Sequence, residues 1–185
     1  MISGLQHSYQ MMDLIRKTSG TGVANFLFQY RDDKLTSKEL EKVLKPQFSP
    51  IGSNRRTSQE IVMAKLLDFC NCVEDVKILE VLQETFSDLT EEEIKFIPTI
   101  TTNHLLMFST GAARIPVTGF DPAPSISIVH DESKIVPSAQ TCSNVLYLYV
   151  NETSINSPIH RCIVAALMNG GLFSKICVCV FHFCS

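Results

Sequence analysis

The sequence has no tryptophan and no surplus of basic residues. Its 16 lysines and arginines are outnumbered by 19 aspartates and glutamates, so the formal net charge is -3. A broad nucleic-acid surface needs a basic patch, and the densest basic stretch here is only the pair Arg55 and Arg56. The composition therefore predicts a protein with no nucleic-acid partner.

The sequence also has little that would place it in a membrane. The most apolar segment, residues 176–184, is too short to span a bilayer. Residues 1–20 lack the basic start and apolar core of a signal peptide. We therefore expect an intracellular protein, in the cytoplasm or the nucleus, with no membrane partner.

The cysteines do not form an obvious disulfide or metal framework. There are seven, an odd number, which favours free thiols over a disulfide framework. Cys70 and Cys72 form one close pair, and a second cysteine-rich segment with His182 covers residues 177–184. Both spacings are tighter than those of structural zinc knuckles. We expect no metal and no cofactor.

The first half of the chain predicts helices. Thr36, Thr57 and Thr90 are each followed three residues later by glutamate, the capping-box pattern of a helix start. Apolar residues recur at helical spacing over residues 76–86. Proline and glycine predict a loop at residues 46–54, and a second break is expected at residues 71–75.

The second half predicts strands followed by one helix. Short apolar or alternating runs at residues 105–109, 125–130 and 145–150 are strand candidates. Ser157 is a candidate N-cap for the last helix, which should end in a left-handed conformation at residues 169–171. The fold class is therefore α+β, a helical N-terminal part followed by a small α/β part with a short sheet and a C-terminal helix. The predicted core of the C-terminal part is Leu106, Phe108, Leu146, Leu148, Ile163 and Leu167.

One cysteine lies in a position suited to chemistry. Cys142 stands between a loop that begins at Pro137 and the apolar run of residues 145–150. A thiol there would sit at the mouth of a strand, positioned by the backbone without being buried. This is where a nucleophilic cysteine is expected.

Several sequence blocks surround this cysteine in a fixed order. They are Leu106-Met-Phe-Ser-Thr-Gly-Ala-Ala-Arg-Ile-Pro116, Gly119-Phe120, Pro137, Thr141-Cys-Ser-Asn144 with Leu146 and Leu148, and Asn169-Gly-Gly-Leu-Phe173. In order and spacing these blocks resemble the catalytic C-lobe of HECT ubiquitin ligases, and the strong resemblance covers about residues 104–173. The Gly111 and Gly119 blocks look most similar to the divergent HECT domains of the G2/M-phase-specific ligase type.

The resemblance implies a domain plan and an acyl-transfer function. Residues 1–73 would be a helical remnant of the HECT N-lobe, residues 74–173 the C-lobe, and residues 174–185 an atypical apolar tail. Cys142 would accept ubiquitin from a conjugating enzyme as a thioester and pass it to a lysine of a protein substrate. The implied partners are therefore ubiquitin, a ubiquitin-conjugating enzyme and a protein substrate.

The neighbours of Cys142 have candidate roles. Thr141 and Asn144 either orient the loop and stabilise the oxyanion or only close the turn; the second interpretation is favoured for Thr141. Gln140 stands where many family members carry histidine or serine, and it cannot act as a base. The resemblance implies that Phe173 helps the transfer step, although residues 174–185 extend beyond the usual end of the family.

Two other functions remain open. The chain is about half as long as a full HECT domain and shows no recognisable docking site for a conjugating enzyme, which favours a non-catalytic module that binds ubiquitin or another partner. A cysteine hydrolase is the other alternative, with His130 or His160 as the base for Cys142.

Overall fold

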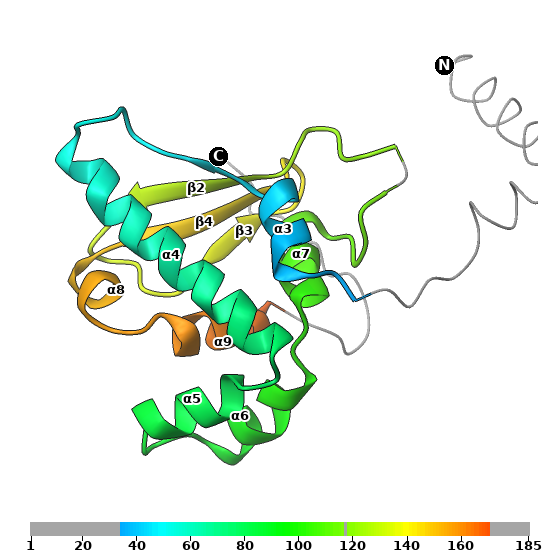
Figure 1. The fold of residues 1–185 in the computed structure, drawn as a ribbon, viewed down its shortest axis with the longest axis vertical. Helices are drawn as coiled ribbons and strands as arrows, with labels where there is room; N and C mark the ends of the chain where they lie inside the picture. Colours follow the sequence, from blue (N-terminus) through cyan, green and yellow to red (C-terminus); the bar gives the residue numbers. More distant parts are fainter. Residues whose placement is uncertain (1–33, 117, 171–185) are drawn as a thin grey trace, which may run out of the picture. The chain divides into compact units, whose positions relative to one another are not determined.

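The computed structural model describes residues 34–116 and 118–170, and in this part the chain folds as α+β, as predicted. A small sheet carries helices against one face, and α4 crosses the sheet in Figure 1. The strands are β1 (Lys45–Gln47), β2 (Ser125–His130), β3 (Ser138–Gln140) and β4 (Val145–Val150). The helices are α3 (Ser37–Val43), α4 (Asn54–Glu74), α5 (Ile78–Thr85), α6 (Glu91–Phe96), the 3-10 turn η1 (Ile97–Thr99), α7 (Thr102–Thr110), α8 (Glu152–Asn156) and α9 (His160–Asn169).

The sheet has the strand order β1-β2-β4-β3. Strands β1, β2 and β4 are parallel, and β3 is antiparallel to β4. Ser125 pairs with Val145, so β2 and β4 begin at the same edge of the sheet. The β3–β4 connection lies at this edge, because Gln140 also pairs with Val145.

The alternation in the strands explains how the sheet packs. Ile126 and Ile128 on β2, and Leu146 and Leu148 on β4, are buried, whereas the residues between them are only half-buried. Successive side chains of a strand point to opposite faces. One face therefore packs under the helices. The strand bounds predicted at residues 125–130 and 145–150 are confirmed.

Two of the predicted capping boxes are confirmed. The Thr36 hydroxyl accepts from the Glu39 amide, and the Glu39 carboxylate accepts from the Thr36 amide. Thr90 and Glu93 form the same reciprocal pair at the start of α6. Each box satisfies backbone donors that the first turn of a helix leaves unpaired.

The third box, at Thr57, was a wrong prediction. Helix α4 begins earlier, at Asn54, where the Ser53 hydroxyl accepts from the Arg55 amide. Glu60 is therefore inside the helix, and its carboxylate lies 2.7 Å from Arg56 Nε, one turn before it. An i,i+4 ion pair and a capping box use the same residue types, so the sequence pattern alone does not separate them.

The break expected at residues 71–75 is present but lies slightly later, at residues 75–77, since α4 continues to Glu74. The chain turns just after it, where Val76 has a φ of 61°. Helix α5 therefore starts at Ile78, inside the helical pattern predicted for residues 76–86.

Residues 105–109 form part of helix α7, not a strand. Their apolar run is short, and a run of this length does not distinguish a strand from a buried helix. Thr101 and His104 form a capping box at the start, and Gly111 ends the helix with a φ of 75°. Leu105, Leu106 and Ser109 are buried, a spacing that matches one face of a helix.

Strand β1 and the start of α9 were not predicted. Pro46 lies in β1, at the edge of the sheet, where a missing backbone donor is tolerated. The predicted loop at residues 46–54 therefore shrinks to residues 48–53. Ser157 follows α8 as its C-cap, and α9 begins only at His160. The left-handed ending predicted for α9 is wrong at Gly170, whose φ is -70°.

One hydrophobic core joins the described elements. Five of the six predicted core residues are at most 1% exposed, and Phe108 is partly buried against the same cluster. A side chain at Gly170 would meet the Phe108 ring at 2.8 Å, so the ring closes over the end of α9. This core contains residues from both sides of position 73, where the predicted N-lobe remnant ends: Leu66 of α4 and Leu167 of α9 both belong to it. The ancestry of residues 1–73 from an N-lobe stays a prediction.

Two polar anchors attach α8 and α9 to the rest of the domain. The Lys65 ammonium donates to the carbonyls of Ser154, Ile155 and Ser157 at 2.6–2.8 Å, which caps the end of α8. Arg161 of α9 donates to both carboxylate oxygens of Glu93 at 2.9 and 3.1 Å. None of the described helices has the length and apolar character needed to cross a bilayer.

Truncating a core residue should destabilise the domain. We expect Leu148→Ala to lower the free energy of unfolding by about 2–5 kcal/mol, because the cavity it leaves can relax only partly. Ile51→Ala is the control, since Ile51 is 89% exposed and surface changes usually stay within about 0.5 kcal/mol. Chemical denaturation measures both, and an unchanged midpoint for Leu148→Ala would contradict this packing.

The Glu93–Arg161 anchor should make the free energy of unfolding depend on pH in the acidic range. Hydrogen bonds from Arg161 and then from Thr90 lower the pKa of Glu93 from 4.5 to about 2. A lowered folded-state pKa stabilises the fold above the unfolded-state value, and that stability is lost as the pH falls through the folded-state value. We expect the difference in unfolding free energy between wild type and Glu93→Gln to shrink between pH 4.5 and 2. Glu92→Gln, at an exposed neighbour, should show no such dependence; equal pH profiles for the two variants would refute the assignment.

Candidate active site

Cys142 lies in the turn between β3 and β4 and is exposed. The amide of Ser143 donates to the Gln140 carbonyl at 3.2 Å, and the amide of Asn144 donates to the Thr141 carbonyl at 3.3 Å. These bonds close the turn beneath the thiol. The sulfur is thus presented outward from backbone that the sheet holds on both sides.

Asn144 fastens this turn to the segment that precedes β2. It is 7% exposed and has a φ of 55°, in the left-handed region that asparagine tolerates better than most residues. Its side-chain amide donates to the Pro122 carbonyl at 2.7 Å. Its own carbonyl accepts from the Ser125 amide at 3.0 Å. Asn144 thereby joins the turn to the first residue of β2.

Thr141 and Gln140 stand at the other side of the turn. Thr141 is exposed, and a side chain added at Gly111, where α7 ends, would lie 3.8 Å from its Cβ. The turn is therefore close to the end of α7. The Gln140 amide oxygen accepts from the Tyr147 hydroxyl at 3.3 Å, so this side chain is held over β4.

The structure does not assemble a cysteine–histidine pair at this site. His130 ends β2, whereas Cys142 precedes β4 at the opposite edge, about 16 Å away along the strands. His160 is buried against Phe69 and Asp68 of α4. Among the residues that the structure covers, neither histidine hydrogen-bonds to Cys142. A dyad hydrolase therefore has no geometric support here.

The other described cysteines differ from Cys142 in exposure. Cys70 is buried, and burial, with Glu74 as a smaller cause, raises the pKa of its thiol to about 12. Burial likewise raises the pKa of Cys72 and of Cys162, both of which are half-buried. A thiol that stays protonated is a poor nucleophile. Phe173, His182 and the cysteines of residues 177–184 lie outside the described residues.

Two residues with a part in shaping the site were missed by the sequence reasoning. The Pro122 carbonyl accepts a hydrogen bond from the turn, and Gly111 lies close to Thr141 on its other side, although both come from segments distant in the sequence. The only local indication of this arrangement is that asparagine and glycine adopt the left-handed backbone conformation more readily than other residues. Their meeting at one turn depends on the sheet pairing.

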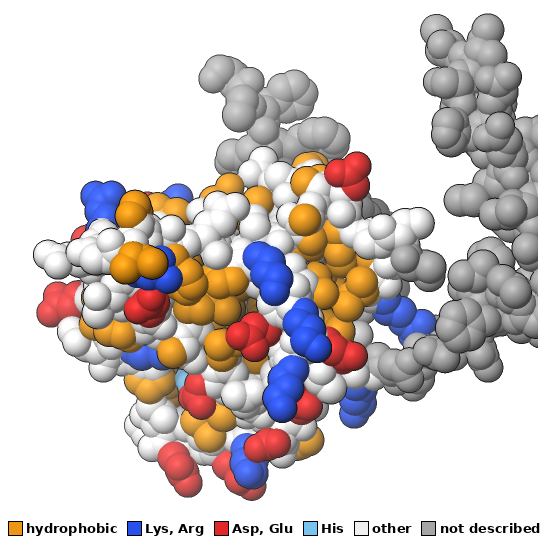
Figure 2. All heavy atoms as spheres, turned by 45° about the horizontal axis from the view of Figure 1, so that its top comes forward, with side chains coloured by type: hydrophobic (Ala, Val, Ile, Leu, Met, Phe, Trp, Pro, Cys, Tyr) orange, Lys and Arg blue, Asp and Glu red, His pale blue; other side chains and the backbone are white. Residues whose placement is uncertain are grey.

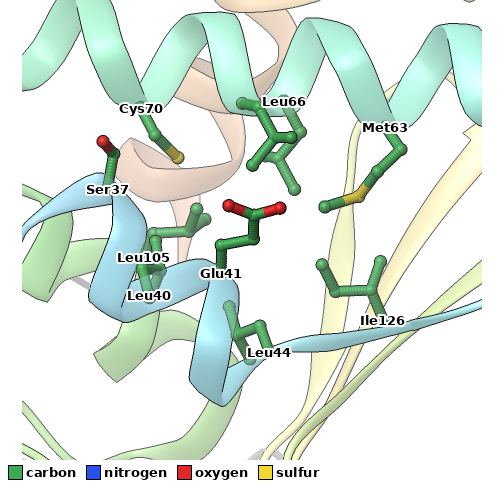
Figure 3. A pocket seen from close by; sticks show the side chains of 10 residues that line it. Ser37, Leu40, Glu41, Leu44, Met63, Leu66, Cys70, Leu105 and Ile126 are labelled. Atoms are coloured by element: carbon green, nitrogen blue, oxygen red, sulfur yellow. The ribbon is translucent and has the colours of Figure 1, made fainter.

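The thiol lies outside the pocket drawn in Figure 3. That pocket is formed between α3 and α4, and its lining is mostly apolar. The Glu41 carboxylate points into the gap between the two helices (Figure 3). Cys142 does not belong to this lining. On the face drawn in Figure 2, lysine and arginine side chains lie among aspartates and glutamates, with hydrophobic side chains between them.

Fold and site together define a class: an α+β domain that presents a cysteine thiol on an exposed, well-anchored turn. The family model described as HECT-domain (ubiquitin-transferase) matches residues 33–174. The chain therefore belongs to the HECT-domain family, whose members are ubiquitin transferases. A search among curated proteins gave no match. The resemblance to the G2/M-phase-specific type stays a prediction.

Replacing Asn144 should loosen the thiol turn in two separable ways. Asn144→Gly loses the bond to Pro122 and should cost about 0.5–1.5 kcal/mol. Asn144→Ala loses the same bond and adds the penalty of a left-handed conformation, about 1–2 kcal/mol more. Thermal unfolding of both variants measures the difference. Equal stabilities of the glycine and alanine variants would show that the left-handed backbone is not retained.

Proposed function

We propose that this chain is a ubiquitin-protein transferase whose nucleophile is Cys142. The supporting observation is the exposure of this thiol on a turn fixed by Asn144, in a chain that belongs to a transferase family. The reacting partner carries its thioester on the surface of another protein, so an exposed sulfur suits it better than an enclosed one. The reaction belongs inside the cell, in the cytoplasm or the nucleus.

The proposed chemistry has two balanced steps. The Cys142 thiolate attacks the thioester carbonyl between ubiquitin and the conjugating enzyme, and that enzyme's cysteine leaves as a thiolate. A lysine amine of the protein substrate then attacks the new thioester. An isopeptide bond forms, the amine loses a proton, and Cys142 is released. Each acyl carbon passes through a tetrahedral oxyanion.

Thr141 and Asn144 are proposed to support this reaction from within the turn. The Asn144 amide already donates to Pro122, which favours a positioning role over direct donation to the oxyanion. Thr141 is exposed beside the thiol and remains a candidate for orienting the incoming thioester. Phe173 is proposed to act in the second step, as the family resemblance implies.

A non-catalytic role is the second candidate. The described residues share one hydrophobic core, so they form a single lobe. In this alternative the domain binds ubiquitin or another partner without being charged.

A charging assay separates the two candidates. Activating enzyme, a panel of conjugating enzymes and ubiquitin are incubated with wild type, Cys142→Ala and the control Cys162→Ser. We expect a thiol-sensitive adduct on non-reducing gels with wild type and Cys162→Ser, and none with Cys142→Ala.

The second outcome is equally informative. No adduct on folded wild type would refute transferase activity for this chain alone and favour the binding module. Adding a HECT N-lobe in trans then tests whether docking was the missing part. An adduct that persists in Cys142→Ala would move the nucleophile elsewhere.

A further inference from the structure

Three side chains that bind metals meet between α4 and α9. Potential ligand atoms of Asp68, Cys72 and His160 all lie within 4.8 Å of one another. Asp68 and Cys72 are four residues apart on α4, so they lie on one face of the helix. His160 is the first residue of α9. The cluster is thus built from two elements far apart in the sequence.

His160 is the most unusual member of this cluster. Its side chain is 5% exposed, yet within the described part of the chain neither ring nitrogen has a hydrogen-bond partner. Its Nε2 lies 3.3 Å from Asp68 Oδ2, close enough for attraction but outside hydrogen-bond geometry. Buried polar groups are nearly always satisfied. The imidazole thus faces a carboxylate and a thiol, and among the described residues its contact with Asp68 is the only polar contact of the ring nitrogens.

The spacing of these atoms suits a tetrahedral ion. Ligands about 2.0–2.1 Å from zinc place a nitrogen and an oxygen about 3.3–3.4 Å apart. This matches the observed 3.3 Å between His160 and Asp68. In such a site a zinc-bound sulfur would lie about 3.5 Å from the other ligand atoms. The potential ligand atoms lie within 4.8 Å of one another, so each distance to the Cys72 sulfur would have to shorten by at most about 1.3 Å.

We propose that Asp68, Cys72 and His160 form a zinc site that clamps α4 to the start of α9. Imidazole nitrogen, thiolate sulfur and carboxylate oxygen are the donors that zinc takes in proteins. Asp68 is exposed, which leaves room for a water as the fourth ligand. The site shares no residue with the thiol turn and is independent of the proposed transferase function.

Zinc binding would use the neutral imidazole of His160 and the thiolate of Cys72. When the sulfur–zinc bond forms, the proton of the Cys72 thiol passes to solvent.

The structure also separates two cysteines that the sequence places together. Cys70 is buried in the core beside Val73 and Leu66, whereas Cys72 is half-buried and faces Asp68. Cys72 therefore belongs to the proposed site, whereas Cys70 does not. The third ligand comes from a helix that begins at residue 160.

Metal titration of the full chain tests the site. Metal-free wild type, Cys72→Ser, Asp68→Asn and the control Cys142→Ser are titrated with Co²⁺ as a spectroscopic probe and then with Zn²⁺. We expect wild type and Cys142→Ser to bind one equivalent more than Cys72→Ser, with a correspondingly stronger thiolate-to-cobalt absorption. Asp68→Asn should weaken binding at least about tenfold, because losing even an outer-shell partner of a ligand typically costs about 10–100-fold in affinity.

Thermal unfolding gives a second readout that does not depend on activity. Zinc should raise the melting temperature of wild type and of Cys142→Ser, and this rise should disappear in Cys72→Ser. Asp68→Asn keeps the comparison valid if Cys72→Ser fails to fold, because the Asp68 side chain is 66% exposed. The cysteines of residues 177–184 are present in every variant, so any metal that they bind contributes equally to all of the measurements. Equal stoichiometry and equal melting shifts across the variants, or no binding to wild type, would overturn the proposal.

Discussion

The parallel pairing of β2 with β4 is the constraint on which the rest of the domain depends. It places Ile126 beside Leu146 and Ile128 beside Leu148, and these four buried side chains form the floor under the helices. The same pairing brings Ser125 opposite Val145. Because both strands begin at one edge, the turn that carries Cys142 is drawn against the segment before β2.

That arrangement explains how an exposed thiol can still be well placed. The sulfur lies outside the core, but the residue two positions later is buried and bonded to Pro122. The position of the turn is therefore fixed by its backbone hydrogen bonds and by Asn144, and not by enclosure of the sulfur. Within the described part of the chain, the Cys142 side chain is exposed rather than enclosed.

Much of this fold could be predicted from local signals. The alternating residues of β2, the apolar run of β4 and the reciprocal bonds of Thr36 and Thr90 depend on neighbours in the sequence, and all four were found. Residues 105–109 were misassigned because a short apolar run fits a strand and a buried helix equally well.

In the candidate site, too, some features could be predicted from the local sequence, whereas others depend on the folded sheet. Cys142 could be singled out from the blocks around it, whereas the contact between Asn144 and Pro122 requires the sheet to form first. Strand β1 was missed because its proline reads as a helix stop, and only an edge position makes it acceptable in a sheet. No sequence pattern indicated that Asp68, Cys72 and His160 would meet. His160 lies 88 positions after Cys72, and only the packing of α9 against α4 brings them together.

The lysine that caps α8 has a consequence for self-modification. In a protein that carries ubiquitin on its own cysteine, every nearby lysine competes as an acceptor, and attack requires a free lone pair on nitrogen. The Lys65 ammonium spends its three N–H bonds on the carbonyls of Ser154, Ile155 and Ser157. Freeing it would uncap the end of α8, so under the proposed reaction the fold disfavours Lys65 as an acceptor, whereas exposed lysines such as Lys38 and Lys42 carry no such restraint.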